Sequence, residues 1–373
     1  MIATIAAASG GIILILLVMQ DVFEVLLLPR RVRRRLRLAG ILFQGTWSLW
    51  REVARLVPVG HTRSAYLSIY GPLSVVVLYL AWASSLIVGY GLCQWGFNHS
   101  LLGQPSFLSD LYLSGSTFFT LGFGDIVPHT PAGKVFAVME AGSGFGLIAA
   151  VIGYLPVLYQ LFSRREAHII QLDARAGSPP SALSLLAGHA DGDAMGELDV
   201  FLRAWEVWGA ELLESHLSYP MLVAYRSQHD NQSWLAALTT IMDTCAVILC
   251  GLKDTKTFQA RMTFAMGRMI IIEMTKVLGL TPMTSAADRL PKEQYKAFAR
   301  QLSAIGLNAR ETGAEQRLAA FRTTYEPFLL PLSKFLMLEL PDWVPNNAPD
   351  NWQTSAKGEL AKQLIDEAPT RPC

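Results

Sequence analysis

The chain has 373 residues, of which 51% are hydrophobic and 16% charged, and its mean hydropathy is +0.32. Soluble proteins carry about a quarter of charged residues, so this composition excludes an ordinary soluble domain and indicates a membrane protein. The charges are uneven, because residues 164–373 hold 21 of the 31 basic and 24 of the 30 acidic residues. We therefore expect a membrane part followed by a polar part. Neither part is basic enough to indicate a nucleic acid partner.

Residues 1–29 are expected to form an N-terminal transmembrane helix. The run carries no charge before Asp21 and stays apolar to Leu28, which is long enough to cross a bilayer core of about 30 Å. Arginines follow the run instead of preceding it, unlike in a cleavable signal peptide, so we expect the segment to be retained with its N-terminus outside. Asp21 and Glu24 are expected either to pair with this arginine cluster or to line an ion pathway.

Residues 30–65 form a basic interfacial segment in this interpretation. Residues 29–65 hold nine arginines against one acid, Glu52. Apolar residues alternate with Arg51 and Arg55, as in a helix lying in the membrane interface. This helix is either a plain anchor or a cuff around a channel.

Two further spans bound a loop without basic residues. No Asp, Glu, Lys or Arg occurs between Arg63 and Asp110, and residues 66–91 are apolar enough for a second span, while residues 141–163 complete a third. The loop 94–133 has no Lys or Arg, so the positive-inside bias places it outside and the C-terminal part in the cytosol. The predicted localisation is the cytoplasmic (inner) membrane, crossed several times.

The loop between these spans carries a short helix that is not long enough to cross a membrane. Pro105 and Ser106 mark its start, and Asp110 complements the positive end of its dipole. Its C-terminal end then directs partial negative charge toward the membrane centre, which favours a cation.

The hexapeptide Thr120-Leu-Gly-Phe-Gly-Asp125 follows this helix. Successive carbonyls can face one way and replace the water shell of an ion only if alternate residues adopt conformations that glycine takes cheaply, and Gly122 and Gly124 are so placed. The side chains of Leu121 and Phe123 are then expected to point away from the pore. Asp125 adds a negative charge at the outer mouth, where it concentrates cations.

The order of span, short helix, Thr-x-Gly-Phe-Gly-Asp and span, over residues 64–163, resembles the prokaryotic potassium channel family with one pore loop per chain. The resemblance implies a homotetramer, because four chains are needed to close one filter. It also implies that K⁺ is coordinated by Thr120, Leu121, Gly122 and Phe123, with Gly124 completing the filter and Asp125 behind its outer end. The sequence departs from the family at Leu121, where Val is commonest, and at Phe123, where Tyr is usual.

Residues 66–163 are the pore domain in this interpretation, and the third span carries its gate. Gly144 lies 20 residues after Gly124, where the resembled family has its hinge, although small residues also serve close helix packing, the use expected of Gly142 and Gly146. Phe145, Ile148, Ile152 and Pro156 fall on one face, which by family position lines the cavity and the inner gate. Pro156 is expected to kink the helix, and the apolar gate to close by dewetting.

Glu140 is a costly carboxylate within the third span. It is expected either to brace the back of the short helix through Ser116 or to sense protons.

The polar part is expected to be all-helical, with a linker at 164–181, a cytosolic helical domain at 182–340 and a tail at 341–373. The linker contains a break at residues 176–180. Asp243 with Arg261 and Arg268 forms either an anionic-ligand site or a buried ion pair. Trp205, Trp208 and Trp234 serve either a core or a pocket.

The predicted fold is thus an all-α integral membrane pore-loop channel, with three transmembrane helices and a pore helix, joined to an all-helical cytosolic domain. The predicted function is a tetrameric potassium channel, with K⁺ as transported ion, no organic cofactor, the lipid bilayer as surroundings and an unidentified cytosolic ligand or partner. The alternatives are a weakly selective cation channel and a membrane sensor with a vestigial pore. No nucleophile with its base and no metal-spaced cluster indicates an enzyme.

Overall fold

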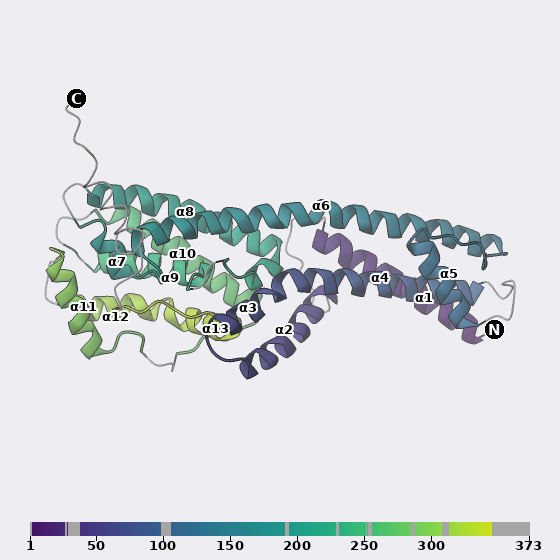
Figure 1. Ribbon diagram of the computed structural model, residues 1–373, viewed down its shortest axis with the longest axis horizontal. Helices are drawn as coiled ribbons and strands as arrows, with labels where there is room; N and C mark the ends of the chain where they lie inside the picture. The colour runs from purple at the N-terminus through teal and green to yellow at the C-terminus, as the bar shows by residue number, and fades with distance from the viewer. Residues whose placement is uncertain are drawn as a thin grey trace, which may run out of the picture. The chain divides into compact units, whose positions relative to one another are not determined.

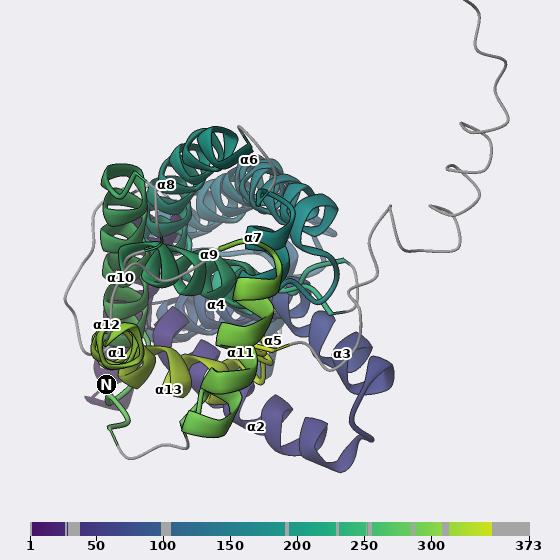
Figure 2. The same cartoon turned by 90° about the vertical axis from the view of Figure 1, so that its left-hand side faces the viewer.

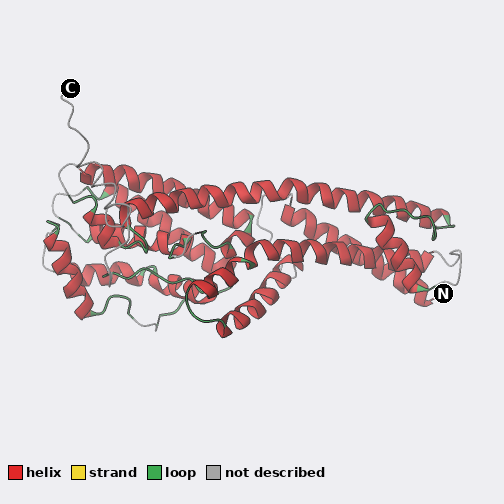
Figure 3. Ribbon diagram, viewed as in Figure 1, coloured by secondary structure: helices red, strands yellow, loops and turns green. Residues whose placement is uncertain are grey.

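The computed structural model describes residues 2–26, 28, 38–97, 106–190, 194–228, 231–250, 252, 256–284, 288–307 and 313–344. Within these ranges every regular element is a helix, as Figure 3 shows. Three of these helices are long and apolar enough to cross a membrane. The all-α membrane fold predicted from the sequence is confirmed.

The chain divides into two compact units. We call residues 1–160 with 218–225 the membrane unit, and residues 161–217 with 226–373 the helical unit. The short segment 218–225 was not expected to join the membrane unit, because it is too short and too irregular to read as a span.

In the described part of the chain the membrane unit is built from six α-helical segments, which Figure 1 labels, and one short 3₁₀ helix. They are α1 (Ile2–Leu26), α2 (Leu38–Leu56), α3 (His61–Ser68), α4 (Tyr70–Phe97), α5 (Phe107–Phe118), the first part of α6 (Pro131–Ala176) and the 3₁₀ helix η1 (Pro220–Ala224). The three candidate spans are α1, α3 with α4, and α6.

Small residues bring α1 and α4 into close contact. A Cβ atom added at Gly11 would lie 2.5 Å from the carbonyl oxygen of Gly89, and one added at Gly96 would lie 2.6 Å from the Cβ of Ala8. Lipid tails are as apolar as leucine, so membrane helices associate mainly through such close packing. The first span is therefore fixed against the second by residues that leave no room for a larger side chain.

Asp21 ties three helices of the membrane unit together. Its carboxylate is buried and accepts hydrogen bonds from Trp82 Nε1 of α4 at 2.8 Å and from the backbone nitrogen of Ala39, in α2, at 3.1 Å. The expected arginine partners, residues 30–37, lie outside the described residues. Among the described residues, an indole and a main-chain amide take the place that was expected for an arginine.

The α2 helix has an inner and an outer face. Trp47 is buried, with its ring 4.8 Å from that of Tyr70, whereas Leu49 and Leu56 are exposed. Trp50 stacks on Tyr66 at 4.5 Å, which fixes α3 against α2. An exposed apolar face on a helix that also carries arginines fits the expected position in the membrane interface.

The helical unit contains the end of α6 and seven further helices. They are α7 (Ala182–Ala187), α8 (Ala194–Ser218), α9 (Trp234–Leu249), α10 (Phe258–Val277), α11 (Lys292–Ala304), α12 (Ala314–Thr323) and α13 (Glu326–Leu336). Residues 234–248 of α9 are all buried, and Figure 2 shows this helix between α10 and α7. The apolar α9 is the centre of the unit's core, as expected for an apolar helix too short to span.

Both ends of this unit differ in detail from a simple linker and tail. Residues 164–176 continue α6, which ends at Ala176, and Gly177 follows at a φ of +77°, at the expected break. At the other end Trp343 is 1% exposed and packs on Phe298 at 5.5 Å. The first tail residues thus belong to the core of the helical unit, while residues 345–373 lie outside the described part.

Candidate ion pathway

The short helix expected in the loop is α5. The Ser106 side chain caps it by accepting a hydrogen bond from the backbone nitrogen of Ser109 at 3.2 Å, and Asp110 lies in the first turn. The helix packs on α4 so closely that a Cβ at Gly91 would lie 3.3 Å from the Cα of Leu111. Pro105 lies outside the described residues. The predicted start of the helix and the position of Asp110 in its first turn are confirmed.

The backbone after α5 alternates in conformation. The φ angles of Thr120, Gly122 and Gly124 are +56°, +58° and +77°. Glycine adopts positive φ without steric cost, as predicted for Gly122 and Gly124, whereas a β-branched residue there is an outlier. The strained Thr120 was not anticipated, and such strain is typical of functional sites.

We call residues 120–125 the alternating strand, although they are not part of a β-sheet. Two hydrogen bonds anchor its start. The backbone nitrogen of Thr120 donates to the Thr117 carbonyl at 3.0 Å, and that of Leu121 donates to the Ser116 carbonyl at 2.8 Å. Both acceptors lie in the last turn of α5, where helix carbonyls lack intrahelical partners. The end of α5 therefore sets the position of the first carbonyls of the strand.

The residues of the alternating strand are exposed and are not covered by the rest of the chain. Residues 120–125 are all exposed, including the side chains of Leu121, at 57%, and Phe123, at 68%. The Asp125 side chain interacts with that of Tyr112 of α5. A single chain thus presents one open strip of main chain and leaves its large side chains uncovered.

The third span touches the end of α5 at Gly144. A Cβ added there would lie 2.2 Å from the carbonyl oxygen of Phe118, whereas nothing lies within 4 Å of one added at Gly142 or Gly146. The geometry supports the close-packing alternative for Gly144. The expected packing role of Gly142 and Gly146 has no counterpart within this chain, because both face open space.

The face of α6 expected to line a cavity is turned away from the core of its own chain. Phe145 and Ile152 are 69% and 67% exposed, Pro156 is exposed and Ile148 is half-buried. The opposite face carries the buried Leu147, Tyr154 and Leu158. The helix continues through Pro156 without a break in its assignment.

Glu140 lies behind α5, fully buried. Its carboxyl group contacts the hydroxyl of Ser114, and that hydroxyl also lies 2.7 Å from the Ile87 carbonyl oxygen of α4. The expected contact with Ser116 is wrong, because two residues further along a helix the side chain points about 200° away. Bracing of α5 by Glu140 is present, through a different serine.

In the helical unit, Asp243 belongs to a buried ion-pair network. Arg289 donates to its Oδ2 at 2.8 Å and to Oε1 of Glu326 at 3.1 Å, and the Tyr325 hydroxyl contacts its Oδ1. Burial alone would lower the pKa of Arg289, but Asp243 raises it above its ordinary value. The ion-pair alternative is confirmed, although its partner is Arg289 and neither Arg261 nor Arg268.

The tryptophans assigned to a core or a pocket are buried in the core, and Trp208 also lines a cavity. Trp205, Trp208 and Trp234 are all at most 2% exposed. The indole of Trp208 donates to the Arg165 carbonyl oxygen at 3.3 Å, which ties α8 to the end of α6.

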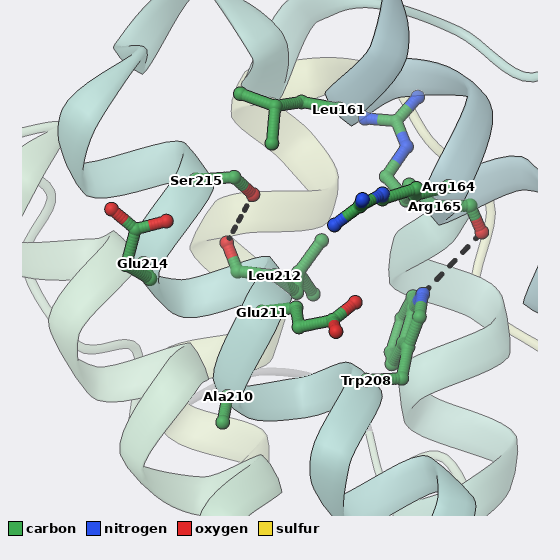
Figure 4. A pocket seen from close by; sticks show the side chains of 9 residues that line it. All are labelled: Leu161, Arg164, Arg165, Trp208, Ala210, Glu211, Leu212, Glu214 and Ser215. Atoms are coloured by element: carbon green, nitrogen blue, oxygen red, sulfur yellow. Dashed lines mark hydrogen bonds between the residues drawn. The ribbon is translucent and has the colours of Figure 1, made fainter.

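A cavity of about 310 Å³ lies beside that bond, between α6 and α8 (Figure 4). Its lining includes Arg164 and Arg165 on one side and Glu211 on the other. Arg165 is buried, pairs with Glu166 at 3.0 Å and lies 3.4 Å from Nε2 of His216. Burial and the Arg165 charge lower the pKa of His216 to about 3. This cavity could not be predicted from a sequence pattern, because its lining residues come from two helices that lie about 50 positions apart in the chain.

Within the described ranges, no group of three or more His, Cys, Asp or Glu side chains could hold a metal ion.

Comparison with known proteins agrees with this geometry. Residues 74–160 match a family model described as ion channel, and this range contains α5, the alternating strand and the exposed face of α6. The three candidate spans indicate a membrane protein, and residues 74–160 of it are similar to an ion channel domain. The chain is also 25% identical over 220 residues to the uncharacterized membrane protein YdjJ of Bacillus subtilis (strain 168). That alignment covers 55% of this chain and 60% of the relative's length. No solved structure matches the chain.

Proposed function

We propose that the protein is a homotetrameric potassium channel of the cytoplasmic membrane. Potassium ions pass down their gradient through a filter formed by residues 120–124 of four chains, with Asp125 concentrating cations at the outer mouth. One observation carries the proposal: positive φ angles alternate at Thr120, Gly122 and Gly124 directly after a capped short helix. In the proposed filter, this alternation allows successive carbonyl oxygens to face one side.

The exposed surfaces of the membrane unit support four-fold assembly. Lipid can cover an apolar side chain such as Phe123 or Phe145, but it cannot satisfy exposed main-chain groups. Gly122 and Gly124, which consist of main chain alone, are exposed, so their main-chain groups need either water or other protein around them. Four strands around one water-filled axis supply both.

The helical unit is cytosolic in this proposal and assembles or gates the pore. The arginine-rich segment 29–65 lies on the inner side by the positive-inside bias, which puts the N-terminus outside and the helical unit inside. The gate is the apolar face with Phe145, Ile148, Ile152 and Pro156. The cavity beside Arg164 and Trp208 is the candidate place for an effector in the helical unit.

Bi-ionic recordings from the full chain in liposomes test the selectivity. The expected permeability ratio of K⁺ over Na⁺ exceeds about tenfold. Gly122→Ala should abolish selective conduction, since positive φ costs a residue with a Cβ about 1 kcal/mol or more in each of four chains. Gly142→Ala is the matched control, because that position is helical and open.

Other results of the same experiment would support different functions. Equal K⁺ and Na⁺ permeability would establish the weakly selective cation channel. Intact tetramers without any ion flux would favour a membrane sensor with a vestigial pore. Monomers or dimers in lipid would contradict the filter itself.

Removing residues 182–373 tests the proposed role of the helical unit. Because α6 runs from the gate face into this unit, truncated channels should keep their selectivity and change their open probability. Unchanged gating would remove the gating role, and loss of tetramers would make assembly the main role.

A further inference from the structure

The Ser114 hydroxyl lies where three helices of the membrane unit meet. Its Oγ is 2.7 Å from the Ile87 carbonyl oxygen of α4 and in contact with Oε1 of Glu140 in α6, while Ser114 itself belongs to α5. All three helices of the proposed pore thus converge on one hydroxyl.

Proton counting decides the form of this contact. A serine hydroxyl has one hydrogen, and a carbonyl oxygen has none. If Ser114 donates its hydrogen to Ile87, the hydrogen between Ser114 and Glu140 has to come from the carboxyl group. An ionised Glu140 would leave two acceptors competing for a single hydrogen.

The surroundings of Glu140 agree with a neutral acid. The side chain is fully buried, its Oε2 has no hydrogen-bond partner, and no Lys or Arg among the described residues pairs with it. The titratable groups that face it are Tyr90 and Cys93 of α4, neither of which supplies a positive charge. A buried carboxylate without a cation is far more costly than a neutral carboxylic acid with one hydrogen bond.

We propose that Glu140 is a protonated positioning residue, which donates a hydrogen bond to Ser114 and thereby fixes the rotation of α5 below the filter. Ser114 in turn donates its own hydrogen to the Ile87 carbonyl oxygen, so a continuous chain of hydrogen bonds runs from α6 through α5 to α4. The carbonyl oxygens of Thr117 and Ser116, at the end of α5, accept hydrogen bonds from the first filter residues. The rotation of α5 therefore determines the position of the filter carbonyls. This inference rests on the proposed pore function.

Infrared difference spectroscopy tests the protonation without any ion flux. At neutral pH, the spectrum of the wild-type full chain minus that of Glu140→Gln should contain the carbonyl band of a protonated carboxylic acid. Ser114→Ala should shift that band, because the acid loses its acceptor, whereas Ser116→Ala should leave it unchanged. A carboxylate band in the difference spectrum would overturn the proposal.

Flux measurements on the same variants test the positioning role. Glu140→Gln keeps a donor and should retain the wild-type K⁺ over Na⁺ ratio, whereas Glu140→Leu keeps the volume without the donor and should lower the ratio about tenfold. In strongly alkaline buffer the wild type should lose selectivity and Glu140→Gln should not. Equal ratios in Glu140→Leu and wild type, or the same alkaline loss in both wild type and Glu140→Gln, would overturn the role.

These outcomes separate the two proposals. If the wild type itself fails to prefer K⁺, the proposed function is wrong, and the infrared result still decides the state of Glu140. If the wild type is selective and the Gln variant behaves like the Leu variant, only the positioning role is wrong.

Discussion

In the membrane unit, the buried carboxyl groups of Asp110 and Glu140 reach no basic side chain in the described part of the chain. In the helical unit, the buried Asp243 is enclosed by Arg289 and Tyr325. A group without a counter-charge is cheapest when neutral, while a paired group keeps its charge. A substitution that disturbs a buried carboxyl group should therefore cost much more stability in the helical unit than in the membrane unit.

The two units can also be compared in how their helices pack. Gly11, Gly96 and Gly144 bring main chains together in the membrane unit, and a single Cβ would collide there. Large buried rings occur in both units, for example Trp82 in the membrane unit and Trp208 in the helical unit. Close main-chain contact is the feature expected where helices pack in lipid, because lipid tails are as apolar as the side chains.

The largest effect is expected from breaking the ion-pair network of the helical unit. Arg289→Met leaves Asp243 and Glu326 buried without their shared cation, which should destabilise this unit by about 3–5 kcal/mol. Asp110→Asn in the membrane unit removes no ion pair and should cost less than about 1 kcal/mol. Hydrogen exchange of α9 and α5 amides measures both. Similar losses of stability in the two variants would contradict the proposed difference between paired and unpaired buried carboxyl groups.

A smaller effect is expected from filling one close contact in the membrane unit. Gly144→Ala places a methyl group against the Phe118 carbonyl oxygen and should destabilise the unit by about 1–3 kcal/mol. Gly146→Ala, on the same helix with open space around it, is the matched control. Thermal unfolding of the purified protein in lipid measures the pair, and equal midpoints would contradict the close contact.

The next effect concerns pH and is confined to the helical unit. His216 has a folded pKa of about 3 against an ordinary value of 6.5, so the unfolded chain binds the proton more readily. Stability should therefore be complete above about pH 6.5 and fall with decreasing pH, by at most about 1.4 kcal/mol per pH unit. Hydrogen exchange of α8 amides follows this loss. An unchanged pH profile in His216→Gln would show that other groups cause it.

The smallest effect is expected at an exposed ion pair of the helical unit. Lys276 lies 2.9 Å from Glu273 one turn earlier, and its side chain is 66% exposed. Solvent screens such a pair, so Lys276→Gln should change the stability by less than about 0.5 kcal/mol. A loss as large as that of Arg289→Met would show that burial does not set the strength of the ion pairs here.

The sequence predicted those features that depend on local chemistry. The three spans follow from uncharged runs of sufficient length, the start of α5 from Ser106, and the conformations of Gly122 and Gly124 from glycine's freedom at positive φ. Each of these follows from a short stretch of residues with no knowledge of its partners.

The features that the sequence did not predict depend on rotation and on distant partners. The sequence could place Glu140 behind α5 but not choose between Ser114 and Ser116, because the rotation of a short helix is set by tertiary packing. Arg289 lies 46 residues from Asp243 in a segment without helical periodicity, so no pattern linked them. The cavity beside Arg165 likewise depends on how two distant helices pack.

The open strip of main chain at residues 120–125 bears on how the protein is made. A newly inserted chain cannot leave such groups in lipid, where each unsatisfied one costs several kcal/mol. Under the proposed assembly, a single subunit is unstable in the bilayer, so it has to bind the other subunits soon after insertion. Neighbouring ribosomes on one messenger are then the natural source of the four subunits, which makes oligomerisation a step of biogenesis.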